Sequence, residues 1–407
     1  MKPKTTNSNL DKIAIRNILS IRYNPMEKPL IKPARWQDFA NEIQDRKGIQ
    51  IQKLLEKSIM SNLSDKKSIA ISLSGGIDST LCLGLIRHVF PDKKIIGVCG
   101  VFAGGFDESI VAKKIADKFN ADFHIVHMES IFTNMPEIIS ITKKPKWNTY
   151  IHLIAKHSRK FTNAFVTGDG SDELFGGYTF RYRKFLNLLG DNDNWKIRTI
   201  NYLECHNRDW VPDQERMFGP SIKFNWDNIY NYFKPYFQNS LSPLKQVMLA
   251  DFNGKLLHDF IPMGRAIASH YGIQSFPVFL DPEIISSALK LPMEQKYDQK
   301  TQKGKLVLRE IATRLGIKHI DEKRGFSPSL FTDWKEHGRE ICKKYLMDER
   351  SEIYQKKLIN INWVRRAFHT VEDDGDIRYL NRLISILALE IWFRVAIIKD
   401  MKSTSRL

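Results

Sequence analysis

The sequence predicts an α/β protein, with a parallel sheet covered by helices on both faces and a mainly helical C-terminal region. Three observations support this fold class. Short apolar runs alternate with helical segments of ten or more residues between residues 67 and 190. Two of those runs end in glycine-rich turns, and the chain beyond Gly190 has long amphipathic segments without convincing strands. Strands separated by such helices form parallel sheets, which bind ligands at the carboxyl ends of their strands.

The predicted core begins with an apolar run that ends in Ser-Gly-Gly, as a buried strand entering a tight turn does. Helical spacing then continues from Thr80 until Pro91 stops it, and a second apolar run is closed by two glycines. In chain order the predicted elements are strand 68–73, helix 80–90, strand 95–102, helix 108–119, strand 123–127, helix 150–160 and strand 164–167. Residues 67–190 are therefore expected to form the α/β core.

Two further regions flank this core. Residues 1–66 are predicted to be an N-terminal preamble, with a strand-like piece at 13–21 and then a helical stretch. Residues 191–407 are predicted to be mainly helical and to complete the fold. Their longest apolar run, 383–398, is interrupted by charged residues and is too short to span a bilayer. We interpret this run as a buried amphipathic helix.

The composition is that of an ordinary globular protein, with 42% apolar and 27% charged residues. The four cysteines are scattered without a Cys-x-x-Cys pair, so neither a disulfide framework nor a zinc site is expected. The polar N-terminus lacks the apolar stretch of a signal peptide, which predicts a cytoplasmic protein outside any membrane. The net charge of +17 fits a nucleic-acid partner or a lysine-rich surface around a phosphate site. We favour the second interpretation because the basic residues are spread along the chain.

The first chemical motif is Ser-Gly-Gly-Ile-Asp-Ser at residues 74–79, between a predicted strand and a predicted helix. Glycines let the backbone turn sharply and bring its N–H groups close to an anion, and the helix adds its positive dipole end. Ser74 and Ser79 can donate hydrogen bonds to phosphate oxygens. Asp78 cannot face a bare phosphate favourably, which indicates a bridging Mg²⁺. The alternative is a turn that only caps a helix, and the strand–turn–helix context favours the phosphate site.

The second motif is Gly-Asp-Gly-Ser-Asp-Glu-Leu-Phe-Gly-Gly-Tyr at residues 168–178, again directly after a predicted strand. Three carboxylates among glycines are poorly suited to a core but suit a cation held against phosphates. Asp172 could join Asp78 on one Mg²⁺. The alternative is an acidic loop that caps a helix, and we favour the cation site.

These two motifs, in this order and at this separation, resemble the synthetase domain of asparagine synthetase and its relatives, the β-lactam and carbapenam synthetases and lasso-peptide cyclases. The resemblance covers roughly residues 54–392. The further segments that carry it are 106–109 (FDES), 305–310 (KLVLRE), 323–326 (KRGF) and 387–392 (LALEIW). It implies an ATP-pyrophosphatase core, similar to adenine nucleotide α-hydrolases. The implied enzyme is a ligase that activates a carboxylate as an acyl-adenylate, releases pyrophosphate and passes the acyl group to an amine.

The resemblance also implies how ATP would be held. Leu73 and Cys99 would hold the adenine through backbone groups, and Gly168 would lie near the ribose and the α-phosphate. The serines and glycines of the first turn would cradle pyrophosphate. The full set of implied ATP-binding residues is Leu73, Ser74, Gly75, Gly76, Asp78, Ser79, Cys99, Gly100, Gly168 and Asp169.

Metal and catalytic roles follow from the same resemblance. Asp78 and Asp172 would bind Mg²⁺. Lys323 would stabilise charge on the α-phosphate and the leaving pyrophosphate, with assistance from Lys305. Lysine suits this role because its ammonium is a compact point charge.

The chain departs from the family at its N-terminus. The family's synthetase domain normally follows a glutaminase domain that begins with a catalytic cysteine. This chain has Lys2 at that position, and no cysteine precedes Cys82. We therefore expect that this chain does not hydrolyse glutamine, so that ammonia, a separate glutaminase or another amine supplies the nitrogen.

The chain also departs from the family at positions expected to bind the carboxylate and amine substrates. Gln274 stands where the family usually has a Glu that serves as base, and an amide cannot take a proton. Phe276 replaces a usual Arg, and Gly264 replaces the Asp of an Asp-Arg pair. The candidate acceptor-pocket residues are Gln274, Arg265 and Glu173. With these changes we expect substrates other than aspartate and ammonia.

Two alternatives stay open on the sequence. A tRNA-modifying ATP-pyrophosphatase shares the 74–79 motif and would explain the basic charge, but it does not need the 168–178 motif. A non-catalytic ATP-binding subunit would explain Gln274, but Asp78, Asp172 and Lys323 are all present.

Overall fold

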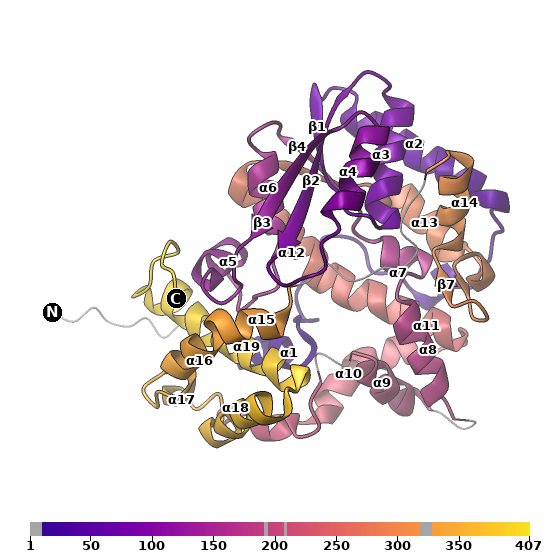
Figure 1. Ribbon diagram of the computed structural model, residues 1–407. Helices are drawn as coiled ribbons and strands as arrows, with labels where there is room; N and C mark the ends of the chain where they lie inside the picture. The colour runs from indigo at the N-terminus through magenta and orange to yellow at the C-terminus, as the bar shows by residue number, and fades with distance from the viewer. Residues whose placement is uncertain (1–9, 191–193, 207–209, 318–327) are drawn as a thin grey trace.

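The structure, a computed structural model, describes residues 10–190, 194–206, 210–317 and 328–407 (Figure 1). Its centre is a five-stranded sheet in the order β3-β2-β1-β4-β5, in which every neighbouring pair is parallel. The strands are β1 (Ser68–Ser72), β2 (Lys94–Phe102), β3 (Asp122–Met128), β4 (Ala164–Thr167) and β5 (Gln274–Pro277). A separate small hairpin pairs β6 (Tyr297–Asp298) with β7 (Lys303–Gly304). The predicted α/β class with a parallel sheet is confirmed.

Helices surround this sheet on both faces. The helices before β5 are α1 (Lys12–Ile21), α2 (Ile49–Leu63), α3 (Ile77–Val89), α4 (Ser109–Lys118), α5 (Met135–Thr142), α6 (Ile151–Ser158), α7 (Ser171–Phe175), α8 (Thr179–Leu188), α9 (Trp195–Glu204), α10 (Trp226–Phe237), α11 (Pro243–Asp251) and α12 (Ile261–Tyr271). Those after it are α13 (Pro282–Lys290), α14 (Leu306–Arg314), α15 (Leu330–Asp333), α16 (Arg339–Leu346), α17 (Glu352–Gln355), α18 (Ile361–Asp374) and α19 (Ile377–Trp392).

Burial on both faces explains the near-continuous apolar runs of the central strands. Ile69 and Ile71 of β1 pack into the cluster that includes α2, α3 and α4. Ala70, between them, belongs to the cluster on the opposite face with α6 and α12. The predicted core strands and helices are confirmed, with ends that differ by a few residues.

One strand of the sheet comes from a region where none was expected. Residues 191–407 are mainly helical, as predicted, but β5 joins β4 along the edge of the sheet, with Gln274 opposite Ala164 and Pro277 opposite Thr167. The prediction of no strand beyond residue 190 is therefore wrong. Its four residues, Gln-Ser-Phe-Pro, show no apolar alternation and include a proline, which an edge strand tolerates because one side needs no partner.

The predicted strand-like piece at 13–21 is also wrong, because this segment forms α1. Asp11 caps the helix by accepting a hydrogen bond of 2.9 Å from the Ala14 N–H. Ile15 and Leu19, four residues apart, are both buried, as one face of a helix requires. The isoleucines of this segment favour a strand locally, but the burial of one helical face decides its structure.

The C-terminal region packs around α19, whose buried side chains face α16 and α18. The predicted amphipathic helix at 383–398 is confirmed as the end of α19 and a π-helical continuation, Phe393–Ile398. No helix in the described part of the chain is long and apolar enough to cross a membrane.

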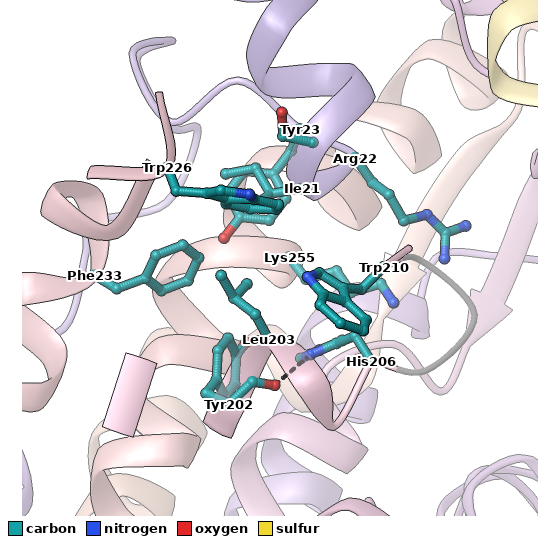
Figure 2. Close-up of a pocket in the computed structure, with 11 residues that line it drawn as sticks. Ile21, Arg22, Tyr23, Tyr202, Leu203, His206, Trp210, Trp226, Phe233 and Lys255 are labelled. Carbon is teal, nitrogen blue, oxygen red and sulfur yellow. Dashed lines mark hydrogen bonds between the residues drawn. The ribbon is translucent and has the colours of Figure 1, made fainter. Parts of the chain in front are cut away.

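A small aromatic cavity of about 30 Å³ lies between α1, α9 and α10. Figure 2 shows Tyr202, Trp226 and Phe233 around it, with the imidazole Nδ1 of His206 hydrogen-bonded to the Tyr202 carbonyl. This volume holds roughly two water molecules. None of the lining residues belongs to the two glycine-rich turns.

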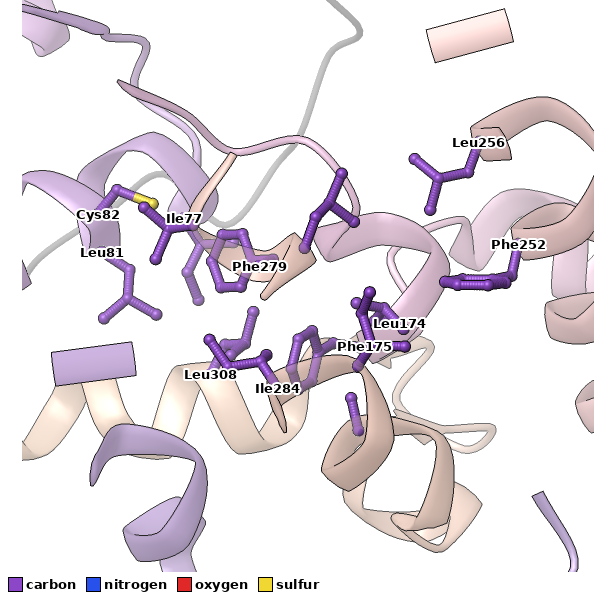
Figure 3. Close-up of a cluster of buried hydrophobic side chains, with 14 of the residues drawn as sticks. Ile77, Leu81, Cys82, Leu174, Phe175, Phe252, Leu256, Phe279, Ile284 and Leu308 are labelled. Atoms are coloured by element: carbon purple, nitrogen blue, oxygen red, sulfur yellow. The ribbon is translucent and has the colours of Figure 1, made fainter. Parts of the chain in front are cut away.

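An apolar cluster beneath the two glycine-rich turns holds them together (Figure 3). Ile77 begins α3, directly after the first turn, and Phe175 ends α7, inside the second motif. The Phe175 ring meets the Phe279 ring edge-on at 5.8 Å between centroids. Leu308 of α14 is buried in the same cluster. This cluster therefore brings together α3, α7 and α14, which are far apart in the sequence, next to the sheet.

Candidate active site

The first glycine-rich turn leaves the carboxyl end of β1 and is held by its own serines. The Leu73 N–H donates to the Val98 carbonyl at 2.9 Å, which continues the pairing of β1 with β2 by one residue. The hydroxyls of Ser74 and Ser79 lie 3.0 Å apart, and the Ser74 N–H donates to Ser79 Oγ at 3.0 Å. The Gly76 N–H donates to Ser74 Oγ at 3.2 Å. Both hydroxyls therefore shape the turn around its backbone N–H groups.

One backbone N–H of this turn already donates to a carboxylate. The Gly75 N–H donates to Glu108 Oε2 at 3.2 Å. Glu108 precedes α4, in the loop that follows β2. The turn therefore presents its backbone to an anionic oxygen, as a phosphate site must. Sequence reasoning included Glu108 in the resemblance but assigned it no role, and its place directly after a buried strand was the available signal.

The two motifs meet at one buried lysine. Lys305 Nζ lies 2.5 and 2.6 Å from the two carboxylate oxygens of Asp78 and 2.6 Å from Asp172 Oδ1. Ser171 Oγ lies 3.3 Å from the same ammonium. Lys305 is only 3% exposed. The structure thus brings together three residues that the sequence analysis placed in one site, although 227 positions separate Asp78 from Lys305.

Two glycines of the second motif make room for this cluster. A Cβ added to Gly177 would overlap both Asp172 Oδ1 and Lys305 Cε. A Cβ added to Gly168 would lie 2.9 Å from the Cβ of Asp78, closer than real Cβ contacts come. These positions need glycine because charged side chains pack directly against the backbone.

The cluster also suits a divalent cation. Asp78 and Asp172 come from different helices, and both direct carboxylate oxygens at one point, where the ammonium of Lys305 lies. Carboxylate oxygens are preferred ligands of Mg²⁺. Within the described residues no group of three or more His, Cys, Asp or Glu side chains is suited to a metal. Asp78 and Asp172 would therefore hold such an ion, which would supply positive charge next to the first glycine-rich turn.

The other two acids of the second motif lie differently. Asp169 Oδ2 accepts a hydrogen bond of 2.8 Å from Thr167 Oγ1, and burial raises the pKa of its carboxyl group. Glu173 is 3% exposed and accepts a hydrogen bond of 2.5 Å from the Tyr178 hydroxyl. Burial raises the pKa of Glu173 to about 7. Glu173 is therefore enclosed by the fold and is absent from the lining of the large cavity described below.

The expected adenine-binding residues lie on neighbouring strand ends. Leu73 directly follows β1, and Cys99 lies in β2, one residue beyond the pairing of Ser72 with Val98; each is 2% exposed. Burial raises the pKa of the Cys99 thiol to about 12, so this thiol is neutral. Gly100 follows and is half-buried. Only backbone groups of these residues are suited to hold a polar ligand.

A cavity of about 720 Å³ lies along the β5 edge of the sheet. It contains both Arg265 and Gln274, with Asp169 at the ATP-site end. Gln274 is at the amino end of β5, whereas Asp169 follows the carboxyl end of β4, so the cavity extends along the strand edge. The full lining is Leu30, Ser61, Asn62, Ser64, Asp65, Lys66, Asp169, Phe260, Ile261, Gly264, Arg265, Ala268, Gln274, Ser275, Phe276, Pro277 and Leu280.

Two sets of residues fall outside the sequence-based picture. Lys323, expected to stabilise phosphate charge, lies outside the described residues with the rest of its motif. Ser171, Glu108 and Lys66 contact the site or the cavity but were not singled out from the sequence.

A parallel sheet whose glycine-rich turns gather backbone N–H groups, carboxylates and a lysine at the carboxyl ends of its strands is the arrangement of the ATP-pyrophosphatase fold class. Residues 50–394 match the family described as asparagine synthase. The chain therefore belongs to the asparagine synthase family.

Individual relatives are distant in sequence. The chain is 23% identical over 401 residues to asparagine synthetase (glutamine-hydrolyzing) 1 of Bacillus subtilis, an alignment that covers 88% of this chain and 61% of the relative. It is 25% identical over 289 residues to a putative asparagine synthetase (glutamine-hydrolyzing) of Mycobacterium tuberculosis, which covers 62% of this chain and 44% of that protein. The chain thus matches about half the length of these relatives. Among solved structures, NMN synthetase from Francisella tularensis matches with 14% identity and a TM-score of 0.26, covering 51% of this chain and 91% of that chain.

Proposed function

We propose that this chain is an ATP-dependent, amide-forming ligase. It activates a carboxylate as an acyl-adenylate and transfers the acyl group to ammonia or another amine. The observation that carries the proposal is the cluster of Asp78, Asp172 and Lys305 beside the glycine-rich turn, in a chain of the asparagine synthase family. Buried ion pairs are costly compared with apolar packing of the same volume, so stability alone does not account for a buried charge cluster at this point.

The turn would bind the pyrophosphate part of ATP. The Gly75 N–H, now donating to Glu108, would donate to a phosphate oxygen instead, and the carboxylate of Glu108 would move away because like charges repel. Ser74, Gly76 and Ser79 would hold the same group. Lys305 would turn its ammonium toward the phosphates and offset their negative charge. Mg²⁺, when held by Asp78 and Asp172, would neutralise further phosphate charge.

The reaction has two steps. In the first, a substrate carboxylate oxygen attacks the α-phosphorus of ATP, and the bond to the bridging oxygen of pyrophosphate breaks. In the second, the amine nitrogen attacks the acyl carbon, loses one proton, and AMP leaves. This chain's residues hold the reacting groups together and stabilise charge on the phosphates, which are the main contributions available to such transfers. By the family resemblance, Lys323 adds charge stabilisation at the α-phosphate.

The nitrogen source is part of the proposal. Ammonia, a separate glutaminase or another amine supplies it. Gln274 offers only hydrogen bonds, so the proton that the amine loses is taken by another group or by water.

The test is exchange of labelled pyrophosphate into ATP, with Mg²⁺ and a panel of carboxylates, followed by AMP formation when amines are added. Asp78→Asn should lower the exchange roughly a thousandfold, because lost charge neutralisation costs several kcal/mol in the barrier. The matched control is Asp117→Asn, an exposed carboxylate of α4 that pairs with Lys113. Cleavage of ATP to ADP and phosphate, or full exchange in Asp78→Asn, would contradict the proposal.

A further inference from the structure

The large cavity along β5 exceeds what a free amino acid needs. Its volume of about 720 Å³ is within the roughly 300–1,000 Å³ typical of pockets for drug-sized ligands. It starts at Asp169, one residue after Gly168, whose backbone packs against Asp78. The Asp169 end of the cavity is therefore next to the second glycine-rich turn, and most of its volume lies away from that turn along β5.

The cavity presents one cation that has no partner among the described residues. Arg265 lines the cavity, is exposed, and makes no hydrogen bond or ion pair with any residue in the described part of the chain. Lys66, the other cation, is paired with Asp65 at 2.9 Å. Next to it in the chain, a Cβ added to Gly264 would meet no atom of the described residues within 4 Å, so the cavity wall is not closely packed there. An exposed arginine without a protein partner can bind a carboxylate or phosphate through two parallel hydrogen bonds.

About half of the lining residues are apolar. Phe260, Ile261 and Leu280 line the cavity, and Phe276 lies there with the Lys66 ammonium 5.9 Å from its ring centroid. Aromatic walls contribute to binding through the apolar area that they cover. A ligand that only filled the polar part of the cavity would leave these side chains facing water.

On the basis of the proposed function, we propose that the cavity binds the carboxylate substrate as an amphipathic molecule larger than a free amino acid. Its reacting carboxylate lies at the Asp169 end, its apolar body lies against Phe260 and Phe276, and a second anionic group is held by Arg265. Free aspartate has the two anionic groups but not the apolar body.

Three probes separate these features. N-benzyloxycarbonyl-aspartate has both carboxylates and an aromatic body, free aspartate lacks the body, and N-benzyloxycarbonyl-β-alanine lacks the second carboxylate. Binding of each to the full chain is measured by calorimetry without ATP. We expect the first probe to bind at least roughly tenfold more tightly than either other, since a charged hydrogen-bonded contact contributes about that factor or more.

Two variants test the role of Arg265. Arg265→Gln should abolish the advantage of N-benzyloxycarbonyl-aspartate over N-benzyloxycarbonyl-β-alanine and leave the affinity for the latter unchanged. Gly264→Asp should also weaken binding of N-benzyloxycarbonyl-aspartate, because it adds a like charge to the cavity wall that the second carboxylate faces. The control is Arg35→Gln, which removes an exposed arginine that pairs with Asp38.

The inference is overturned if N-benzyloxycarbonyl-aspartate does not bind, if free aspartate binds equally well, or if Arg265→Gln leaves the probe affinities unchanged. These results are distinct from failure of the proposed function. If probe binding depends on Arg265 but no carboxylate supports pyrophosphate exchange, only the proposed ligase function is overturned. Carboxylate-dependent exchange that needs Asp78 but is indifferent to Arg265 would overturn only the cavity assignment.

Discussion

The glycine-rich turns and the β5 cavity differ in how completely their side chains are satisfied. At the turns, Lys305 is buried between two carboxylates, and Gly177 has no space for a methyl group. In the cavity, Arg265 has no partner among the described residues, and Gly264 adjoins open space. The first region is determined by its own contacts. The second has an exposed cation and open space that its own side chains do not fill.

This difference indicates which half of the proposed reaction varies. A packed charge cluster tolerates few substitutions, because each partner removed leaves a buried charge uncompensated. An open wall tolerates many, since little contact is lost. Departures from the family at Gly264, Gln274 and Phe276 all fall on the cavity lining.

The largest expected effect, on both activity and stability, comes from removing Lys305, which pairs with both carboxylates of the charge cluster at the glycine-rich turns. Lys305→Ala should lower pyrophosphate exchange at least roughly a thousandfold and the free energy of unfolding by about 3–5 kcal/mol, because Asp78 and Asp172 would lose their shared cation. Exchange assays and urea unfolding measure the two effects. Lys113→Ala, which breaks an exposed pair, is the control and should change stability by less than about 1 kcal/mol. Equal stability of the two variants would show that the cluster is not structural.

A smaller effect is expected when one methyl group is added in each region by a glycine-to-alanine substitution. Gly177→Ala should lower exchange activity by about a hundredfold and destabilise the fold by about 1–3 kcal/mol, because its Cβ overlaps Asp172 and Lys305. Gly264 lies in a helix, and its added Cβ would have no neighbour within 4 Å among the described residues, so Gly264→Ala should be neutral or stabilising by up to about 1 kcal/mol. Thermal unfolding and exchange rates provide the comparison. Similar losses in both variants would mean that the cavity is as closely packed as the turns.

The smallest expected effect is a pH dependence of the free energy of unfolding that arises from Glu173 in the second glycine-rich motif. Burial raises the pKa of Glu173 to about 7 from its ordinary 4.5. The folded chain therefore keeps a proton that the unfolded chain releases above pH 4.5, so Glu173 destabilises the fold increasingly as the pH rises toward 7. Relative to the parent chain, Glu173→Gln should gain about 2 kcal/mol in the free energy of unfolding between pH 5 and pH 8.

Urea unfolding at both pH values measures this difference. Glu340→Gln, at an exposed carboxylate, should show no such gain. The idea fails if Glu173→Gln follows the same pH profile as the parent chain.

Much of the core was predictable because its signals are local. The apolar runs of β1, β2 and β4 and their glycine-rich ends identify buried strands that enter turns at one edge of a sheet. The same reasoning placed Asp78 and Asp172 in one site, and the structure joins them through Lys305. Lys305 itself was selected only by family resemblance, since one lysine among many has no local signal.

The sequence by itself determined the parallel α/β core, the order of its elements and the two turns, because hydrophobic periodicity and glycine positions act within a few residues. Only the tertiary structure decided that 13–21 is a helix, that Gln274–Pro277 completes the sheet, and that Glu108 reaches the Gly75 N–H. The cavity belongs to this second group, since its walls come from the end of α2, from α12 and from β5. These features depend on contacts between distant segments, whose burial outweighs local preference.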